Sequence, residues 1–206
     1  MNKDYRNTEY CSYNNIVEMK ESLKNEILNK HPRTKILYNK ITKMDYIEKF
    51  RQIYSYKCAY CGVSKDIISL QLFEVDHFIC ESSFNGNKST AGEINNLVLS
   101  CKKCNRVKRD FIWDKKYNSL FNVDDKSIAN LFYRDEDYSI KIEENYREDD
   151  TIYNFYLQLK FYEEFRRLDY LLMNMYGFYN KYSNCELPTE FYNWILMLQK
   201  KRNEYY

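Results

Sequence analysis

Four of the seven cysteines form two C-x-x-C pairs, Cys58 with Cys61 and Cys101 with Cys104. In a compartment where thiols are kept reduced, pairs at this spacing are more typical of metal ligands than of disulfides. Four thiolates satisfy the tetrahedral preference of Zn²⁺ and leave no coordination position open for a substrate. The pattern therefore predicts a structural zinc site, against the alternative of unrelated buried or redox cysteines.

The 39 residues between the two pairs are more than a simple zinc ribbon contains, so an insertion must separate the two knuckles. The chain reads EVDHFI at 74–79, NLVLSC at 96–101 and CNRVK at 104–108. The order C-x-x-C, E-x-D-H, N-L-x-x-x-C-x-x-C-N-x-x-K resembles the HNH endonucleases that have a zinc-bound ββα-metal core. The resemblance covers about residues 58–112, a quarter of the chain.

The resemblance implies a role for each residue of the motif. His77 matches the general base, since an imidazole titrates near neutral pH and can take a proton from water. Asp76 and Asn105 match the ligands of a catalytic cation, and an all-oxygen pair favours Mg²⁺ or Mn²⁺. Asn96 matches the position that fixes the loop and orients the base, and Glu74 is a candidate partner of a ligand.

Three basic residues follow on the same predicted helix as Asn105. Arg106, Lys108 and Arg109 are candidates for phosphate contact, and a merely solvated helix face is an equally good explanation. The motif also departs from the family. Asn105 stands in place of the final histidine, and Cys80 stands where related sequences often have proline, which leaves the loop 81–94 without an assigned role.

Composition narrows the class of protein. Of the 206 residues, 44% are hydrophobic and only four are glycine, which excludes wholesale disorder and argues against a turn-rich all-β fold. The formal net charge is only +2, so affinity for nucleic acid must come from local patches. No apolar run approaches the roughly 18 residues of a membrane span, and the start has no signal-peptide pattern. We therefore expect a cytoplasmic protein.

The N-terminal part predicts two helices. Residues 16–30 repeat apolar positions at spacings of three and four, and His31-Pro32 ends the pattern. A second helix is expected over 43–55. The inward-facing residues of the two predicted helices are Ile16, Met19, Leu23 and Ile27, and then Met44, Ile47, Phe50, Ile53 and Tyr54.

The C-terminal part predicts short strands and then helices. Residues 131–142 are expected to form two strands around a polar turn. Helical spacing then runs from Ile152 to Met175, which predicts one long helix with Asp149 among the capping candidates. A last helix is expected to start at Pro188, with these residues on one face: Phe191, Trp194, Ile195 and Leu198.

These elements predict an α+β protein in three regions. N-terminal helices (1–56) precede the ββα-metal core with its zinc knuckles (57–116), and a mainly helical region (117–206) follows. The expected function is metal-dependent hydrolysis of DNA, with RNA as an open alternative. A zinc-stabilised binding or assembly module without catalysis is the rival hypothesis. More loosely, the chain resembles the HNH subunits of bacterial antiphage systems of the Septu type, which would imply an ATPase partner.

Overall fold

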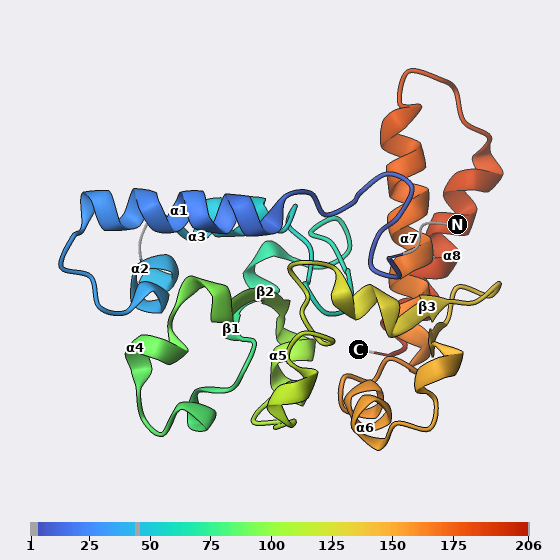
Figure 1. Cartoon of the computed structure of the whole chain (residues 1–206). Helices are drawn as coiled ribbons and strands as arrows, with labels where there is room; N and C mark the ends of the chain where they lie inside the picture. Colours follow the sequence, from blue (N-terminus) through green and yellow to red (C-terminus); the bar gives the residue numbers. More distant parts are fainter. Residues whose placement is uncertain (1–3, 44–45, 206) are drawn as a thin grey trace.

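A β-hairpin followed by a helix lies at the centre of the chain (Figure 1). The computed structural model describes residues 4–43 and 46–205. Strands β1 (Phe73–His77) and β2 (Leu97–Cys101) are antiparallel, and the register pairs Phe73 with Cys101 and His77 with Leu97. Helix α5 (Lys102–Lys108) continues directly from β2. The predicted order of strand, long loop, strand and helix is confirmed, within a mixed fold of helices and small antiparallel sheets.

Three helices lie on one side of the hairpin: α1 (Ile16–Lys30), α2 (Leu37–Lys43) and α3 (Tyr46–Ile53). The extent of α1 is confirmed, but α2 was not predicted and Met44 lies outside the described residues. The predicted inner face of α1 is wrong at one position. Met19 is 40% exposed, whereas Lys20 is 1% exposed because its ammonium pairs with Asp124 at 2.5 Å.

The predicted long C-terminal helix is two helices, α6 (Asp150–Gln158) and α7 (Glu164–Lys181). Lys160 has a φ of 52°, a left-handed conformation that a helix cannot contain, and this turn separates them. The cap at the start is confirmed, because Asp149 Oδ1 accepts hydrogen bonds from the backbone N–H groups of Thr151 and Ile152.

The last helix, α8 (Thr189–Asn203), begins directly after Pro188 as predicted. It packs against α7, and the two helices extend together away from the hairpin (Figure 1, orange and red). Ile195 is buried, but Trp194 is 57% exposed, so the predicted inner face is wrong there. The reason is that α7 covers only part of α8, and Trp194 lies outside the covered stripe.

The predicted pair of short strands is present as β3 (Phe132–Arg134) and β4 (Ile140–Ile142). Their apolar residues join one buried cluster that runs from Tyr5 to Phe161 and includes residues of all three predicted regions. Aromatic rings fill much of it, such as Phe121 stacked on Phe155 at 4.3 Å between centroids. Among the described residues, no helix is both long enough and apolar enough to span a membrane.

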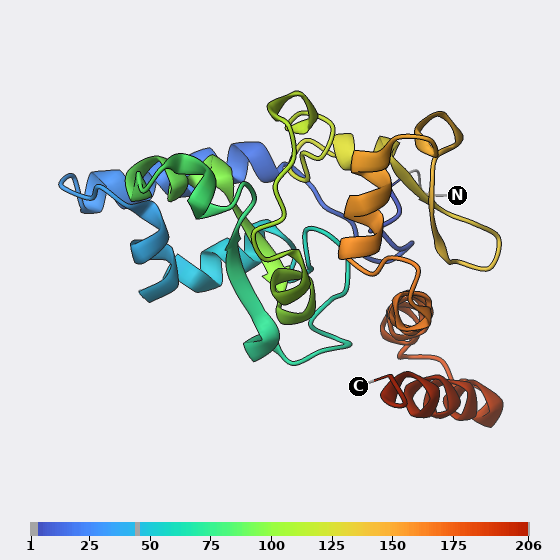
Figure 2. The same cartoon turned by 90° about the horizontal axis from the view of Figure 1, so that it is seen from below.

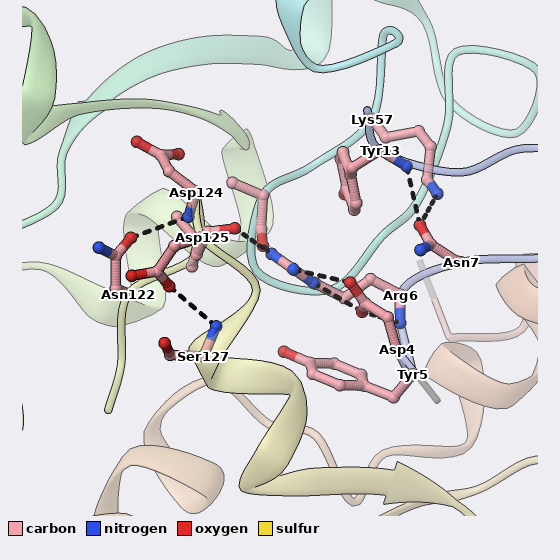
Figure 3. Close-up of polar contacts among 12 residues, drawn as sticks. Asp4, Tyr5, Arg6, Asn7, Tyr13, Lys57, Asn122, Asp124, Asp125 and Ser127 are labelled. Carbon is pink, nitrogen blue, oxygen red and sulfur yellow. Dashed lines mark hydrogen bonds and ion pairs between the residues drawn. The ribbon is translucent and has the colours of Figure 1, made fainter. Parts of the chain in front are cut away.

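The N-terminal segment holds the first zinc knuckle in place (Figure 3). Arg6 is buried, pairs with Asp4 at 2.8 Å and donates hydrogen bonds to the carbonyls of Ala59 and Val123. The hydroxyl of Tyr5 donates to the carbonyl of Tyr60. The segment thus satisfies buried backbone acceptors that the knuckle cannot pair internally.

Gly62 is a point of close approach between this segment and the knuckle. Its φ is +79°, and an added Cβ would lie 2.4 Å from the carbonyl oxygen of Arg6. Gly62→Ala should therefore lower the free energy of unfolding by more than about 1 kcal/mol, measured by denaturant titration. Gly86→Ala is the matched control, because Gly86 has a φ of +81° and nothing within 4 Å. An equal loss in both variants would contradict the steric role of Arg6.

Candidate active site

The four paired cysteines meet in one buried cluster. Their sulfur atoms all lie within 4.8 Å of one another, and Cys61 Sγ is 3.9 Å from Cys101 Sγ. A tetrahedral zinc with Zn–S bonds of about 2.3 Å would separate its sulfurs by about 3.8 Å. The cluster therefore fits the predicted structural zinc site, with every coordination position taken by a thiolate.

Two local structures present these sulfurs. In the first knuckle the backbone N–H of Gly62 donates to the carbonyl of Cys58, and that of Cys58 donates to Val63. In the second knuckle Cys101 is the N-cap of α5, and its sulfur accepts a hydrogen bond from the backbone N–H of Cys104. Because Cys101 also ends β2, the cluster joins the hairpin and its helix to the loop that precedes β1.

A buried arginine from outside the motif contacts the cluster. Arg166 of α7 lies with its guanidinium 3.2 Å from Cys104 Sγ and 2.7 Å from the carbonyl oxygen of Leu159. Within the described ranges, no carboxylate oxygen lies within 4.0 Å of this guanidinium. Burial alone would lower the pKa of Arg166, but the four thiolates raise it well above its usual range. Its countercharge is therefore the cysteine cluster.

His77 is the last residue of β1, and a tyrosine from α2 covers it. The imidazole stacks on the ring of Tyr38, with 4.6 Å between centroids and 27° between planes. His77 is half-buried, and this burial lowers its pKa against a smaller opposing effect of Glu81. A neutral imidazole is the form that can accept a proton. Nothing in the sequence around Tyr38 indicated this contact.

Asp76 lies next to His77 but is enclosed by other groups. Its Oδ2 accepts a hydrogen bond from the hydroxyl of Tyr60 at 2.9 Å and lies 3.4 Å from Nζ of Lys108. Burial raises the pKa of Asp76 to about 6, even though Lys108 and Tyr60 lower it. The effect of burial on the pKa of this carboxyl group thus outweighs that of its two polar neighbours.

Asn105 of α5 lies beside the same strand. Its Nδ2 donates to Oε2 of Glu74 at 2.7 Å, which fixes the end of the amide that carries the oxygen. Glu74 and Asp76 are two residues apart in β1 and so lie on one face of it. The oxygen donors of these three side chains suit Mg²⁺ or Mn²⁺ better than Zn²⁺.

Asn96 ties the insertion loop to the start of β2. Its Oδ1 accepts from the backbone N–H of Ile79, and its Nδ2 donates to the carbonyls of Ile79 and Ala91. The backbone carbonyl of Asn96 also accepts from the N–H of Phe78. These bonds fix the loop that leaves His77, and Ala91 belongs to the short helix α4 (Lys88–Ala91) within it.

The three basic candidates of α5 differ in their surroundings. Arg106 and Arg109 are exposed, and they border a hollow next to α6. Lys108 is buried, and its ammonium donates to the backbone carbonyl of His77 at 2.9 Å. The structure therefore places Lys108 inside the site and the two arginines on the surface. Cys80 lies in the loop, with its sulfur 3.1 Å from the hydroxyl of Ser83.

Comparison with known protein families gives one match. The family model of the HNH endonucleases matches residues 58–111. This segment contains the cysteine cluster, both strands of the hairpin and α5. Comparison with curated proteins and with solved structures gave no match. About a quarter of the chain therefore matches the HNH endonucleases, which supports a function of the nuclease family and a nucleic-acid substrate.

Because Arg166 contacts Cys104, we predict that Arg166 controls how firmly the cluster retains zinc, although the two residues are 62 positions apart in the sequence. Four thiolates and Zn²⁺ would carry a net charge of −2, and the guanidinium of Arg166 offsets one unit of it. Arg166→Met should weaken zinc binding about 10–100-fold, the usual effect of losing a partner of a metal ligand. Competition with a chelator, followed by measurement of bound zinc, checks this.

Arg167→Met is the matched control. Arg167 is the next residue of α7, and its guanidinium pairs with Glu164 at 2.7 Å. Its loss should leave zinc retention unchanged. Equal retention in the two variants would show that the charge of Arg166 is not needed by the cluster.

Proposed function

We propose that this protein is a metal-dependent endonuclease that hydrolyses phosphodiester bonds in DNA. The observation that carries the proposal is the position of His77 within the matched HNH segment, at the end of β1 and next to Asp76. Asp76, Asn105 and Glu74 place oxygen donors around the same strand. Together these groups supply a base and a set of cation ligands at one place.

In the proposed reaction, Nδ1 or Nε2 of His77 accepts a proton from the water that attacks the phosphorus in line with the leaving oxygen. Tyr38 restricts the ring by stacking, and Lys108 holds the backbone of His77 through its carbonyl. Asn96 fixes the loop that follows. The bond between phosphorus and the 3′ oxygen breaks, the 3′ oxygen takes a proton from solvent water, and His77 returns its proton to solvent. The products therefore carry a 5′ phosphate and a 3′ hydroxyl.

Asp76 and Asn105 would hold one Mg²⁺ or Mn²⁺, with Glu74 orienting the amide of Asn105. When bound, the ion supplies stabilisation of the charge that develops on the phosphorane and on the leaving 3′ oxygen. The base is a side chain, so a second ion is not required. Lys108 already places one positive charge at Asp76, which limits the repulsion between this carboxylate and a phosphate.

The rival function is a zinc-stabilised module that binds nucleic acid or assembles with other proteins without cleaving. Purified protein that nicks plasmid DNA only when Mg²⁺ or Mn²⁺ is added would support the enzyme. Binding without cleavage under every divalent ion would support the rival.

We also propose an antiphage role beside an ATPase partner, which rests on the sequence resemblance alone. A pull-down of the full chain from its native host tests this, because an ATPase subunit should be recovered in a stable complex. Recovery of the chain free of any such subunit would count against this role and would leave the endonuclease proposal intact.

His77→Ala should lower cleavage about 10²–10⁴-fold, because a positioned general base contributes that much in rate. Zinc content, circular dichroism and DNA affinity should stay nearly unchanged. Imidazole added in solution should restore part of the activity by entering the space that the side chain leaves. Plasmid cleavage assays with and without imidazole measure both effects, and full activity in His77→Ala would refute the mechanism.

The catalytic ion should be separable from the structural one. Mild EDTA should abolish cleavage while circular dichroism stays intact, and Mg²⁺ or Mn²⁺ should restore it. Asp76→Asn should raise the Mg²⁺ concentration needed for half-maximal cleavage, because a charged ligand is lost. Asp110→Asn is the matched control, because Asp110 is exposed and the substitution removes the same charge. If zinc alone restored activity, the assignment of an oxygen-ligand site for Mg²⁺ or Mn²⁺ would be wrong.

A further inference from the structure

A basic hollow lies outside the matched segment, between the end of α1 and helix α2. It encloses about 730 Å³ and is open to solvent. Residues 31–36 of the connecting turn and part of α2 line it. Among the described residues that line it, none is an aspartate or a glutamate, and four are lysine or arginine: Arg33, Lys35, Lys40 and Lys43.

These four cations differ from the other basic residues nearby. Lys24, Lys30 and Lys49 pair with Glu21 or Glu26 at 3.6 Å or less. For the four cations of the hollow, by contrast, the described part of the chain places no carboxylate oxygen within 4.0 Å of a side-chain nitrogen. Uncompensated positive charge that converges on one concave surface attracts a polyanion.

Helix α2 connects this hollow to the proposed base. Lys40 and Lys43 lie on α2 and line the hollow, while Tyr38 of the same helix stacks on His77. Seven residues of helix span about 10 Å, or roughly three base-pair steps of 3.4 Å. Lys40 and Lys43 follow Tyr38 by about 200° and about 140° around the helix, so a strand with its scissile phosphate at His77 would cross α2 to place its next phosphates at the hollow.

The basic turn is fixed to the insertion loop of the HNH domain. The hydroxyl of Ser89 donates to the carbonyl of Lys35 at 2.6 Å, and the N–H of Tyr38 donates to the carbonyl of Gly92 at 3.2 Å. A Cβ on Gly92 would lie 2.8 Å from a methyl group of Ile36, so the two segments are in close contact. In both views β1 lies between α2 and α5 (Figures 1 and 2).

We propose that the hollow formed by residues 31–43 binds the phosphate backbone of the nucleic acid beside the scissile bond. This rests on the proposed nuclease function and adds the surface that holds the substrate. Four cations that contact phosphates without reaching base edges give affinity that is independent of sequence and sensitive to salt. The N-terminal helices thus have a role in substrate binding as well as in packing.

Two double variants test this, Arg33→Gln with Lys35→Gln, and Lys40→Gln with Lys43→Gln. Each is made in a His77→Ala background, and the affinity for a labelled DNA duplex is measured across salt concentrations without divalent ions. Each lost phosphate contact should reduce the slope of log K against log salt by about 0.9, so each double variant should lose up to about 1.8. Circular dichroism and zinc content should match the parent.

Lys24→Gln with Lys49→Gln is the matched control, because it removes the same charge from residues that pair with glutamates. Its salt slope should equal that of the parent. The proposal is overturned if both hollow variants keep the parent slope, if the control loses as much as they do, or if the parent does not bind DNA. Reduced slopes in the hollow variants, together with a wild-type protein that does not cleave DNA under any divalent ion, would support the hollow and remove the nuclease function.

Discussion

Four thiolates buried at one point are the constraint on which the rest of the structure depends. As thiolates around a metal ion, these groups would carry negative charge into the core, and cations of the protein would compensate part of it. Arg166 brings one such cation from α7 to Cys104. One turn further along α7, Asp169 pairs with Arg202 of α8 at 2.5 Å. Negatively and positively charged side chains therefore alternate from the cysteine cluster along α7 to α8.

The same constraint explains why the HNH domain does not stand by itself in this chain. Three successive backbone carbonyls of the first knuckle, those of residues 58–60, accept hydrogen bonds from Tyr13, Arg6 and Tyr5. Buried carbonyls without partners would destabilise the knuckle, and only that of Cys58 also accepts from within it, from the N–H of Gly62, among the hydrogen bonds of the described residues. The N-terminal segment and α7 thus complete a site whose ligands all lie in the middle of the sequence.

Around His77 the protein combines rigidity with unsatisfied charge. The backbone on both sides of the imidazole is held, by Lys108 at the carbonyl of His77 and by Asn96 at the following loop. Asp76 stays partly uncompensated in spite of Lys108, as its raised pKa indicates. A folded protein tolerates such a group where function requires it, because the cost of burying it is repaid only when a ligand binds.

The sequence by itself determined the features that depend on a few neighbouring residues. The two cysteine pairs, the order of strands and helix in 58–112, the cap at Asp149 and the helix start after Pro188 all follow from local spacing and local hydrogen bonds. Only the tertiary structure decided that Tyr38 covers His77 and that Arg166 faces Cys104. These partners are tens of residues apart, and their contacts depend on how whole helices pack, which no local pattern of apolar residues specifies.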